Sequence, residues 1–189
     1  MHKTSANFQA SMNTRQMVLI ALMTAVTCIL APFSIPIPIS PVPISLTNLV
    51  LYISVFILSW KQATLSYAVY LLLGIAGLPV FSGFAGGLAK VAGPTGGYLA
   101  GFIFLTILSG FVIQKSSGKY RYLFYTLGLL LGTAVMYVFG TFWLAAQMNL
   151  TFAQGLAVGV LPYLPVDIIK IVIALVLGPI LRKRLCNIH

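Results

Sequence analysis

Six apolar stretches occupy almost the whole of this 189-residue chain and leave only short connections between them. They lie near residues 16–33, 46–60, 62–80, 94–114, 122–147 and 164–181. A helix needs about 20 apolar residues to cross the hydrocarbon layer of a bilayer, and the stretches have about this length. We therefore expect an all-α integral membrane protein, a single domain over residues 1–189 that forms a bundle of six transmembrane helices with irregular external loops.

The composition excludes an ordinary soluble domain, because 60% of the residues are hydrophobic and only 6% are charged. The net charge of +10 does not indicate nucleic-acid binding, since no basic run is long enough to follow a phosphate backbone. If the six spans alternate in direction, nine of the 11 basic residues fall on one side and Lys90 alone falls on the other. The nine are Lys3, Arg15, Lys61, Lys115, Lys119, Arg121, Arg182, Lys183 and Arg184. This asymmetry predicts a multi-pass protein of the cell membrane with both termini in the cytoplasm.

Asp167 is the only acidic residue of the chain, and it lies inside the sixth apolar stretch, three residues before Lys170. An ionised side chain in hydrocarbon costs about 3 kcal/mol on insertion scales unless it is paired or faces a cavity. Residues three positions apart share a helix face, so Lys170 is the natural partner of Asp167. Two readings follow. The pair is either a polar anchor for a small ligand or a self-neutralised pair that orders the helix bundle.

Two external connections are unusual. Residues 32–43 alternate prolines with branched apolar residues, which excludes a helix and predicts a stiff, extended strap across the outer mouth of the bundle. Residues 78–90 are rich in glycine and are expected to be irregular, with peptide groups exposed around Gly86 and Gly87. A sixth helix that starts at Pro165 places Asp167 in its first turn, near the outer leaflet. These features together predict a small pocket that opens to the outside.

Small residues recur along several spans. Gly93, Gly97 and Gly101 are spaced by four residues, as is typical of close helix packing, and they lack the Lys-Ser/Thr ending of a nucleotide-binding loop. Ala21 and Ala25, with Thr24 beside them, form a similar face in the first span. That face serves either internal packing or the docking of a partner helix, and the residues alone do not separate the two.

The chain offers almost nothing for catalysis. It has no second carboxylate, no serine–histidine–acid set and no metal-ligand cluster, so we expect no enzymatic activity, no cofactor and no metal site. His2 and His189 are terminal, and Cys28 and Cys186 are not expected to form a disulfide. Six spans without an inverted repeat also argue against a self-sufficient ion-coupled transporter.

Four segments resemble the BioY family, the biotin-specific substrate-binding S components of energy-coupling-factor (ECF) vitamin transporters. They are the strap at residues 37–45, Gly74-Ile-Ala-Gly-Leu-Pro-Val-Phe81, Gly93-Pro-Thr-Gly-Gly-Tyr98 and Leu161-Pro-Tyr-Leu-Pro-Val-Asp-Ile-Ile-Lys170. The last two are specific when they occur together. The resemblance implies a six-helix S-component fold, high-affinity capture of biotin from outside, and partners that comprise a transmembrane T component and two ABC ATPases. It also implies that the Ala21/Ala25 face docks the T component.

The resemblance also implies a site. Asp167 is expected to accept a hydrogen bond from a ureido N–H of biotin, and Lys170 to donate to the ureido oxygen or to neutralise Asp167. The remaining expected contacts are backbone groups at Gly86 and Gly87, the Tyr98 hydroxyl, and the rings of Phe81 and Phe84. Where many relatives carry a glutamine after the strap, this chain has Thr47 and Asn48, so Asn48 is a further candidate. Two alternatives stay open: an S component for another vitamin, and a structural or assembly protein.

Overall fold

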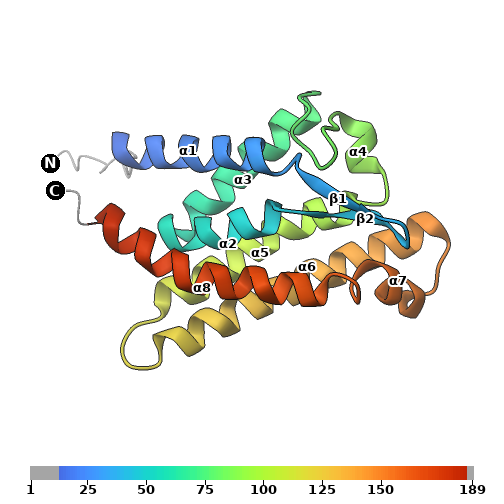
Figure 1. The fold of residues 1–189 in the computed structure, drawn as a ribbon. Coiled ribbons are helices and arrows are strands. Elements are labelled where there is room, and N and C mark those ends of the chain that lie inside the picture. The colour runs from blue at the N-terminus through green and yellow to red at the C-terminus, as the bar shows by residue number, and fades with distance from the viewer. Residues whose placement is uncertain (1–12, 187–189) are drawn as a thin grey trace, which may run out of the picture.

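The computed structural model describes residues 13–186, which form eight α-helices and one β-hairpin (Figure 1). The elements in chain order are α1 (Thr14–Leu30), β1 (Ser34–Ile37), β2 (Ser40–Ser45), α2 (Thr47–Ile57), α3 (Trp60–Ile75), α4 (Leu88–Ala92), α5 (Gly96–Lys115), α6 (Arg121–Met148), α7 (Phe152–Gly159) and α8 (Leu164–Cys186). The fold is therefore mostly helical, as predicted. His2, Lys3 and His189, for which the sequence carried expectations, lie outside the described residues.

Each of the six predicted apolar stretches contains one helix, and α4 and α7 are additional short helices in the connections. Three helices, α5, α6 and α8, are long and apolar enough to cross a membrane, whereas α1 and α2 are shorter apolar helices. The 11 residues of α2 span only about 16 Å. This helix is short because the proline-rich strap precedes it directly: β2 ends at Ser45, and only Leu46 lies between β2 and Thr47.

The strap is extended, as predicted, but it also folds back on itself. Strands β1 and β2 pair antiparallel, with Ser34 opposite Ser45 and Ile35 opposite Ile44, and the register shifts between Ile35 and Ile37. A two-stranded sheet consists only of edge strands, which tolerate proline because one side of each strand needs no ladder donor. The expectation of an entirely helical fold did not include this hairpin.

Both ends of the described chain lie at one end of the bundle, and the hairpin, α4 and α7 lie at the other (Figure 1). The connection between α5 and α6 also lies at the end where the chain begins and finishes. We call this the basic end, because Arg15, Arg121, Arg182 and Lys183 are located in the helix segments that reach it. The opposite end, with the hairpin, is called the strap end.

Glycines bring α5 and α6 into close contact. A Cβ at Gly97 would lie 2.2 Å from the Cβ of Trp143, and one at Gly132 would lie 2.2 Å from the Ser109 hydroxyl oxygen. A Cβ at Gly101 would lie 3.0 Å from backbone atoms of Met136. Small residues at helix contacts are how membrane helices pack closely, so the predicted role of the glycine spacing agrees with the structure.

The bundle interior is rich in tyrosine, and six of the seven buried tyrosines among the described residues have a partner for their hydroxyl. Tyr67 donates to the Leu99 carbonyl at 2.7 Å, and Tyr52 pairs with Thr133 at 2.6 Å. Large apolar side chains instead face outward along α6 and α8, as in Phe142 and Ile169, which are 71% and 60% exposed. An apolar exterior around a hydrogen-bonded interior is what a bilayer requires of an integral membrane protein.

Candidate functional site

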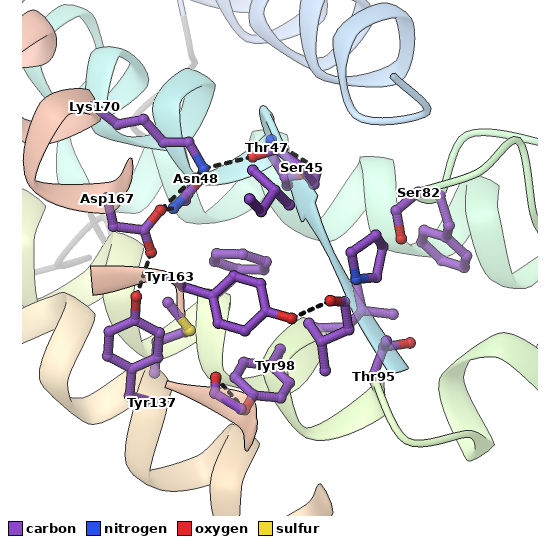
Figure 2. Close-up of a pocket in the computed structure, with 18 of the residues that line it drawn as sticks. Ser45, Thr47, Asn48, Ser82, Thr95, Tyr98, Tyr137, Tyr163, Asp167 and Lys170 are labelled. Carbon is purple, nitrogen blue, oxygen red and sulfur yellow. Dashed lines mark hydrogen bonds and ion pairs between the residues drawn. The ribbon is translucent and has the colours of Figure 1, made fainter. Parts of the chain in front are cut away.

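A cavity of about 70 Å³ lies at the strap end, enclosed by β2, α2, α5, α6 and the start of α8 (Figure 2). Its walls are mainly aromatic and apolar, and the polar side chains of Asn48, Asp167 and Lys170 meet at one side of it. A small enclosed space with a few convergent polar groups is the usual form of a small-molecule site. Typical sites measure roughly 300–1,000 Å³, so the space here is smaller than that of a typical ligand site.

The charged pair predicted from the sequence exists and is deeply buried. The Lys170 ammonium lies 2.9 Å from Oδ1 of Asp167, and each side chain is only 7% exposed. Asn48 joins the pair from α2: its Nδ2 donates to Oδ1 of Asp167 at 2.6 Å, and its Oδ1 accepts from Lys170 at 2.9 Å. Asn48, the further candidate that follows the strap, therefore supplies an amide that contacts both ions.

The local sequence of α8 sets the orientation of the pair. The backbone N–H of Asp167 donates to the Tyr163 carbonyl at 2.9 Å, which places the carboxylate in the first turn of the helix. The positive end of the helix dipole stabilises a carboxylate there. Lys170 follows one turn later on the same face, so its ammonium reaches back to Asp167.

The hydrogen-bonding capacity of the two ions is nearly used up. Lys170 donates its third hydrogen bond to the Ser45 carbonyl at the end of β2, at 2.7 Å. Tyr137 donates its hydroxyl to Oδ2 of Asp167. An ammonium has three donors and a carboxylate has about four acceptor positions. Asp167, with three donors on it, can therefore accept one more hydrogen bond from a ligand, whereas Lys170 must exchange one of its acceptors.

The strap forms the outer wall of the cavity and is held by its neighbours. Tyr163 points across the cavity, and its hydroxyl donates to the Val42 carbonyl of β2 (Figure 2). Lys170 binds the same strand at Ser45. Val42 and Ser45 line the cavity themselves, so a movement of β2 away from α8 would open it.

The remaining walls hold two of the predicted aromatic residues. Tyr98 lines the cavity, and its hydroxyl donates to the Gly159 carbonyl at 2.8 Å. Phe81 also lines the cavity and is fully buried, with its ring 5.6 Å from that of Tyr70. Its position depends on Gly74, since a Cβ there would lie 2.1 Å from the Phe81 ring.

Lys90 on α4 is the second cation that lines the cavity. Partial burial lowers the pKa of the Lys90 amine from its usual value, because desolvation disfavours the charged form. The cavity thus has a neutralised ion pair in one wall and a separate ammonium in another. This arrangement suits a ligand that has a neutral polar group at one end and an anionic group at the other.

The structure brings together five of the predicted site residues and leaves three apart. Asp167, Lys170, Asn48, Tyr98 and Phe81 all line the cavity. Gly86, Gly87 and Phe84 are not among its lining residues.

Their places in the outer loop explain why. A Cβ at Gly86 would lie 2.3 Å from the Leu78 carbonyl oxygen, so Gly86 serves a close backbone contact within the loop. Gly87 has a φ of +85° and donates to the Gly74 carbonyl at 2.7 Å. Phe84 is 60% exposed, and its ring lies 5.4 Å from that of Phe33 on the outer surface.

Sequence reasoning missed three residues of the site. Tyr137 carried no distinguishing signal, because buried tyrosines are common in this chain and none of the quoted segments contains it. Tyr163 lies in the quoted segment that ends at Lys170, but no contact was assigned to it, and its hydroxyl reaches Val42. Lys90 did carry one, since it is the only cation predicted on the outer side. An isolated charge next to a glycine-rich loop is a reasonable candidate for a ligand contact.

Ala21 and Ala25 lie elsewhere, in an apolar groove of about 400 Å³ between α1 and α3. Both alanines are exposed, whereas Thr24 is buried and pairs with the Ser66 hydroxyl at 3.0 Å. The internal contact of α1 with α3 therefore uses Thr24. The two alanines remain on the outer surface of the bundle.

Comparison with known proteins gives consistent matches over nearly the whole chain. A family model described as "BioY family" matches residues 2–187. A probable biotin transporter BioY of Pyrococcus horikoshii is 36% identical over 167 residues, which cover 88% of this chain and 96% of that protein. The biotin transporter BioY of Thermotoga maritima is 35% identical and covers 89% and 96%. A solved S component for biotin from an ECF-type ABC transporter superposes with a TM-score of 0.82 at 33% identity, covering 89% of this chain and 91% of the other.

Proposed function

The chain belongs to the BioY family, and from this premise we propose that it is a biotin-binding S component, without catalytic activity of its own, that captures biotin outside the cell for import by partner subunits. The observation that carries the proposal is the buried Asp167–Lys170–Asn48 cluster, which faces a closed cavity from one wall. A bundle-ordering pair has no need of a cavity beside it.

The cavity matches the chemistry of biotin at both ends. The ureido ring carries two N–H donors and one carbonyl, and the cluster offers a free acceptor position on Asp167 together with donors on Lys170 and Asn48. Hydrogen bonds to charged groups contribute about 1.5–3 kcal/mol each. The apolar thiophane ring fits the aromatic wall that includes Phe81. The carboxylate tail fits the ammonium of Lys90.

The small volume of the cavity implies that biotin enters by displacing the strap. The cavity of about 70 Å³ is smaller than a molecule with 16 non-hydrogen atoms requires, a count that follows from the formula of biotin. Since β2 is held to α8 by Tyr163 and Lys170, these contacts must break or rearrange as the ligand enters. A ligand oxygen can replace the Ser45 carbonyl on Lys170, whereas the Tyr163–Val42 hydrogen bond can re-form over the bound ligand and hold the strap closed.

The direct test is equilibrium binding of biotin to the detergent-purified protein, compared with thiamine and riboflavin under identical conditions. Tight binding of biotin alone supports the proposal. Tight binding of another vitamin instead would identify an S component of different specificity. If none binds to folded protein even at millimolar concentration, the chain is not a vitamin-binding subunit.

We expect Tyr163→Phe to accelerate biotin release. The substitution removes the hydroxyl that holds β2 at Val42 but keeps the aromatic ring in the wall. A net hydrogen bond contributes about 0.5–1.5 kcal/mol, so dissociation should become roughly two- to tenfold faster. Stopped-flow or chase measurements of release would show this. Tyr120→Phe, which alters an exposed tyrosine at the basic end, serves as the control. Equal rates of biotin release from wild type and both variants would show that the Tyr163–Val42 hydrogen bond does not hold the ligand in the cavity.

The lowered pKa of Lys90 predicts a pH dependence of biotin binding. The ammonium form attracts the biotin carboxylate, so affinity is retained below the pKa of Lys90 and falls as the pH rises through it. Because burial lowers this pKa, the fall should begin at a lower pH than an exposed lysine would give. Lys90→Arg should abolish the fall, since arginine stays charged. Lys90→Gln should weaken binding about fivefold at neutral pH and remove the dependence. A Lys90→Gln variant with unchanged affinity would place the carboxylate elsewhere.

The finer topology belongs to the same proposal. We infer six membrane crossings by α1, α2, α3, α5, α6 and α8, with both termini in the cytoplasm. The support is the separation of charges, since the basic end collects the arginines and lysines while Lys90 lies at the strap end. The strap end then faces outward, where biotin arrives. We further propose that the whole chain acts as one domain.

The energy for import must come from other subunits in this proposal. The structural relative is an S component for biotin from an ECF-type ABC transporter, and we propose that this chain likewise associates with a T component and two ABC ATPases. The exposed Ala21/Ala25 groove is the surface that suits a partner helix, because small residues allow close approach within the membrane.

A further inference from the structure

A second cavity lies at the basic end, opposite the biotin site. It measures about 640 Å³, is open to the surface, and is bounded by the segment between α5 and α6, the first turns of α6 and the C-terminal part of α8. Three of its lining side chains are cationic, namely Arg121, Arg182 and Lys183. Ser117 and Tyr122 add hydroxyl groups to the same lining.

These cations have no acidic side chain of their own to pair with. Asp167 is the only aspartate or glutamate in the entire sequence, and it is bound to Lys170 at the strap end. Three positive side chains from two helix ends therefore converge on one cavity without internal compensation. Arginine matches phosphate oxygens with its planar set of donors, and lysine and hydroxyl groups add further donors.

The cavity also lies at the level where a membrane-spanning protein meets lipid headgroups. Arg121 lies over the ring of Tyr122, 5.1 Å from its centre, and Tyr122 is 51% exposed. Tyrosines and cations of this kind mark the membrane interface. Ile180 lines the cavity and is 49% exposed, so the polar space has an apolar, lipid-accessible edge.

We propose that this cavity binds the phosphate headgroup of an anionic phospholipid, with Arg121, Arg182 and Lys183 as its ligands and the acyl chains along the exposed face of α8. A free phosphate ion would use the same three cations but would have no use for the apolar edge at Ile180. Basic pockets between membrane helices on the cytoplasmic side are suited to anionic headgroups. The site is separate from biotin binding and does not depend on it.

The test is the retention of lipid by the full-length protein, measured by native mass spectrometry from micelles that contain phosphatidylglycerol and phosphatidylcholine with the same acyl chains. Wild type should retain phosphatidylglycerol preferentially. The double variant Arg121→Gln/Arg182→Gln should lose the preference, at about fivefold per cation removed. Lys61→Gln/Lys115→Gln is the matched control, because it removes two cations that also lie over aromatic rings but do not line the cavity.

Three outcomes would overturn the proposal. The first is that wild type shows no preference for phosphatidylglycerol. The second is that both double variants lose the preference equally, which indicates diffuse surface charge. The third is that inorganic phosphate at equal concentration displaces the lipid completely, which indicates a site for the soluble ion. If the glutamine double variant does not fold, Arg121→Lys/Arg182→Lys provides the second measurement. It keeps both charges and should retain the preference, and its loss in a folded protein would also contradict the proposal.

Discussion

Replacing Asp167 by asparagine is expected to abolish biotin binding and to destabilise the protein, whereas Asp167→Asn combined with Lys170→Met should recover stability without recovering binding. The single substitution leaves the Lys170 ammonium buried, with only neutral acceptors at Ser45 and Asn48. Breaking a buried ion pair costs about 3–5 kcal/mol, but replacing both ions by neutral residues is often without cost. Stability and function are thereby separated in one set of variants.

The biotin affinity of the double variant should fall at least about a hundredfold, because two charge-assisted hydrogen bonds at about 1.5–3 kcal/mol each are lost. Isothermal titration or ligand-induced thermal shift gives the affinity, and the unfolding temperature of the ligand-free protein gives the stability. A double variant that is stable and binds biotin like wild type would mean that the pair only orders the bundle. A double variant as unstable as Asp167→Asn would mean that the cavity wall itself requires these side chains.

Placing a large side chain at the Ala21/Ala25 groove should abolish transport and leave biotin binding intact. In Ala21→Trp or Ala25→Trp the indole fills the groove between α1 and α3, and a partner helix can no longer approach. Neither alanine lines the strap-end cavity, and no residue lines both the groove and that cavity, so the isolated subunit should bind biotin with unchanged affinity. Uptake of labelled biotin by the reconstituted complex and co-purification of the T component are the two measurements.

Leu22→Trp is the matched control for this experiment. Leu22 lies on the same helix and is 52% exposed, but it does not line the groove, so its variant should transport like wild type. Normal transport by both alanine variants would place the docking surface elsewhere. Equal loss in all three variants would point to a general effect of tryptophan on α1. Accumulation of biotin against a gradient by the purified subunit alone would contradict the need for partners.

Several properties follow from local sequence and were predictable for that reason. The length and apolar character of the stretches indicate membrane helices, and the placement of basic residues predicts an orientation, which stays a prediction. Asp167 and Lys170 meet because residues three apart share a helix face. The strap is extended because its prolines exclude a helix. The close α5–α6 contact at Gly97 and Gly101 likewise follows from residues spaced by four.

The composition of the site could be decided only by the tertiary structure. Asn48 contacts Asp167 across 119 positions of sequence, and Tyr137 reaches the same carboxylate from α6. Gly86 and Phe84, which the sequence placed in the site, belong instead to the packing and the outer surface of their loop. The physical reason lies in the solvent. In water, an amphipathic pattern reveals which helix face is buried. In a bilayer the lipid-facing and core-facing sides are both apolar, so the pattern does not reveal how each helix is rotated, and only packing determines which tyrosine, amide or lysine faces the cavity.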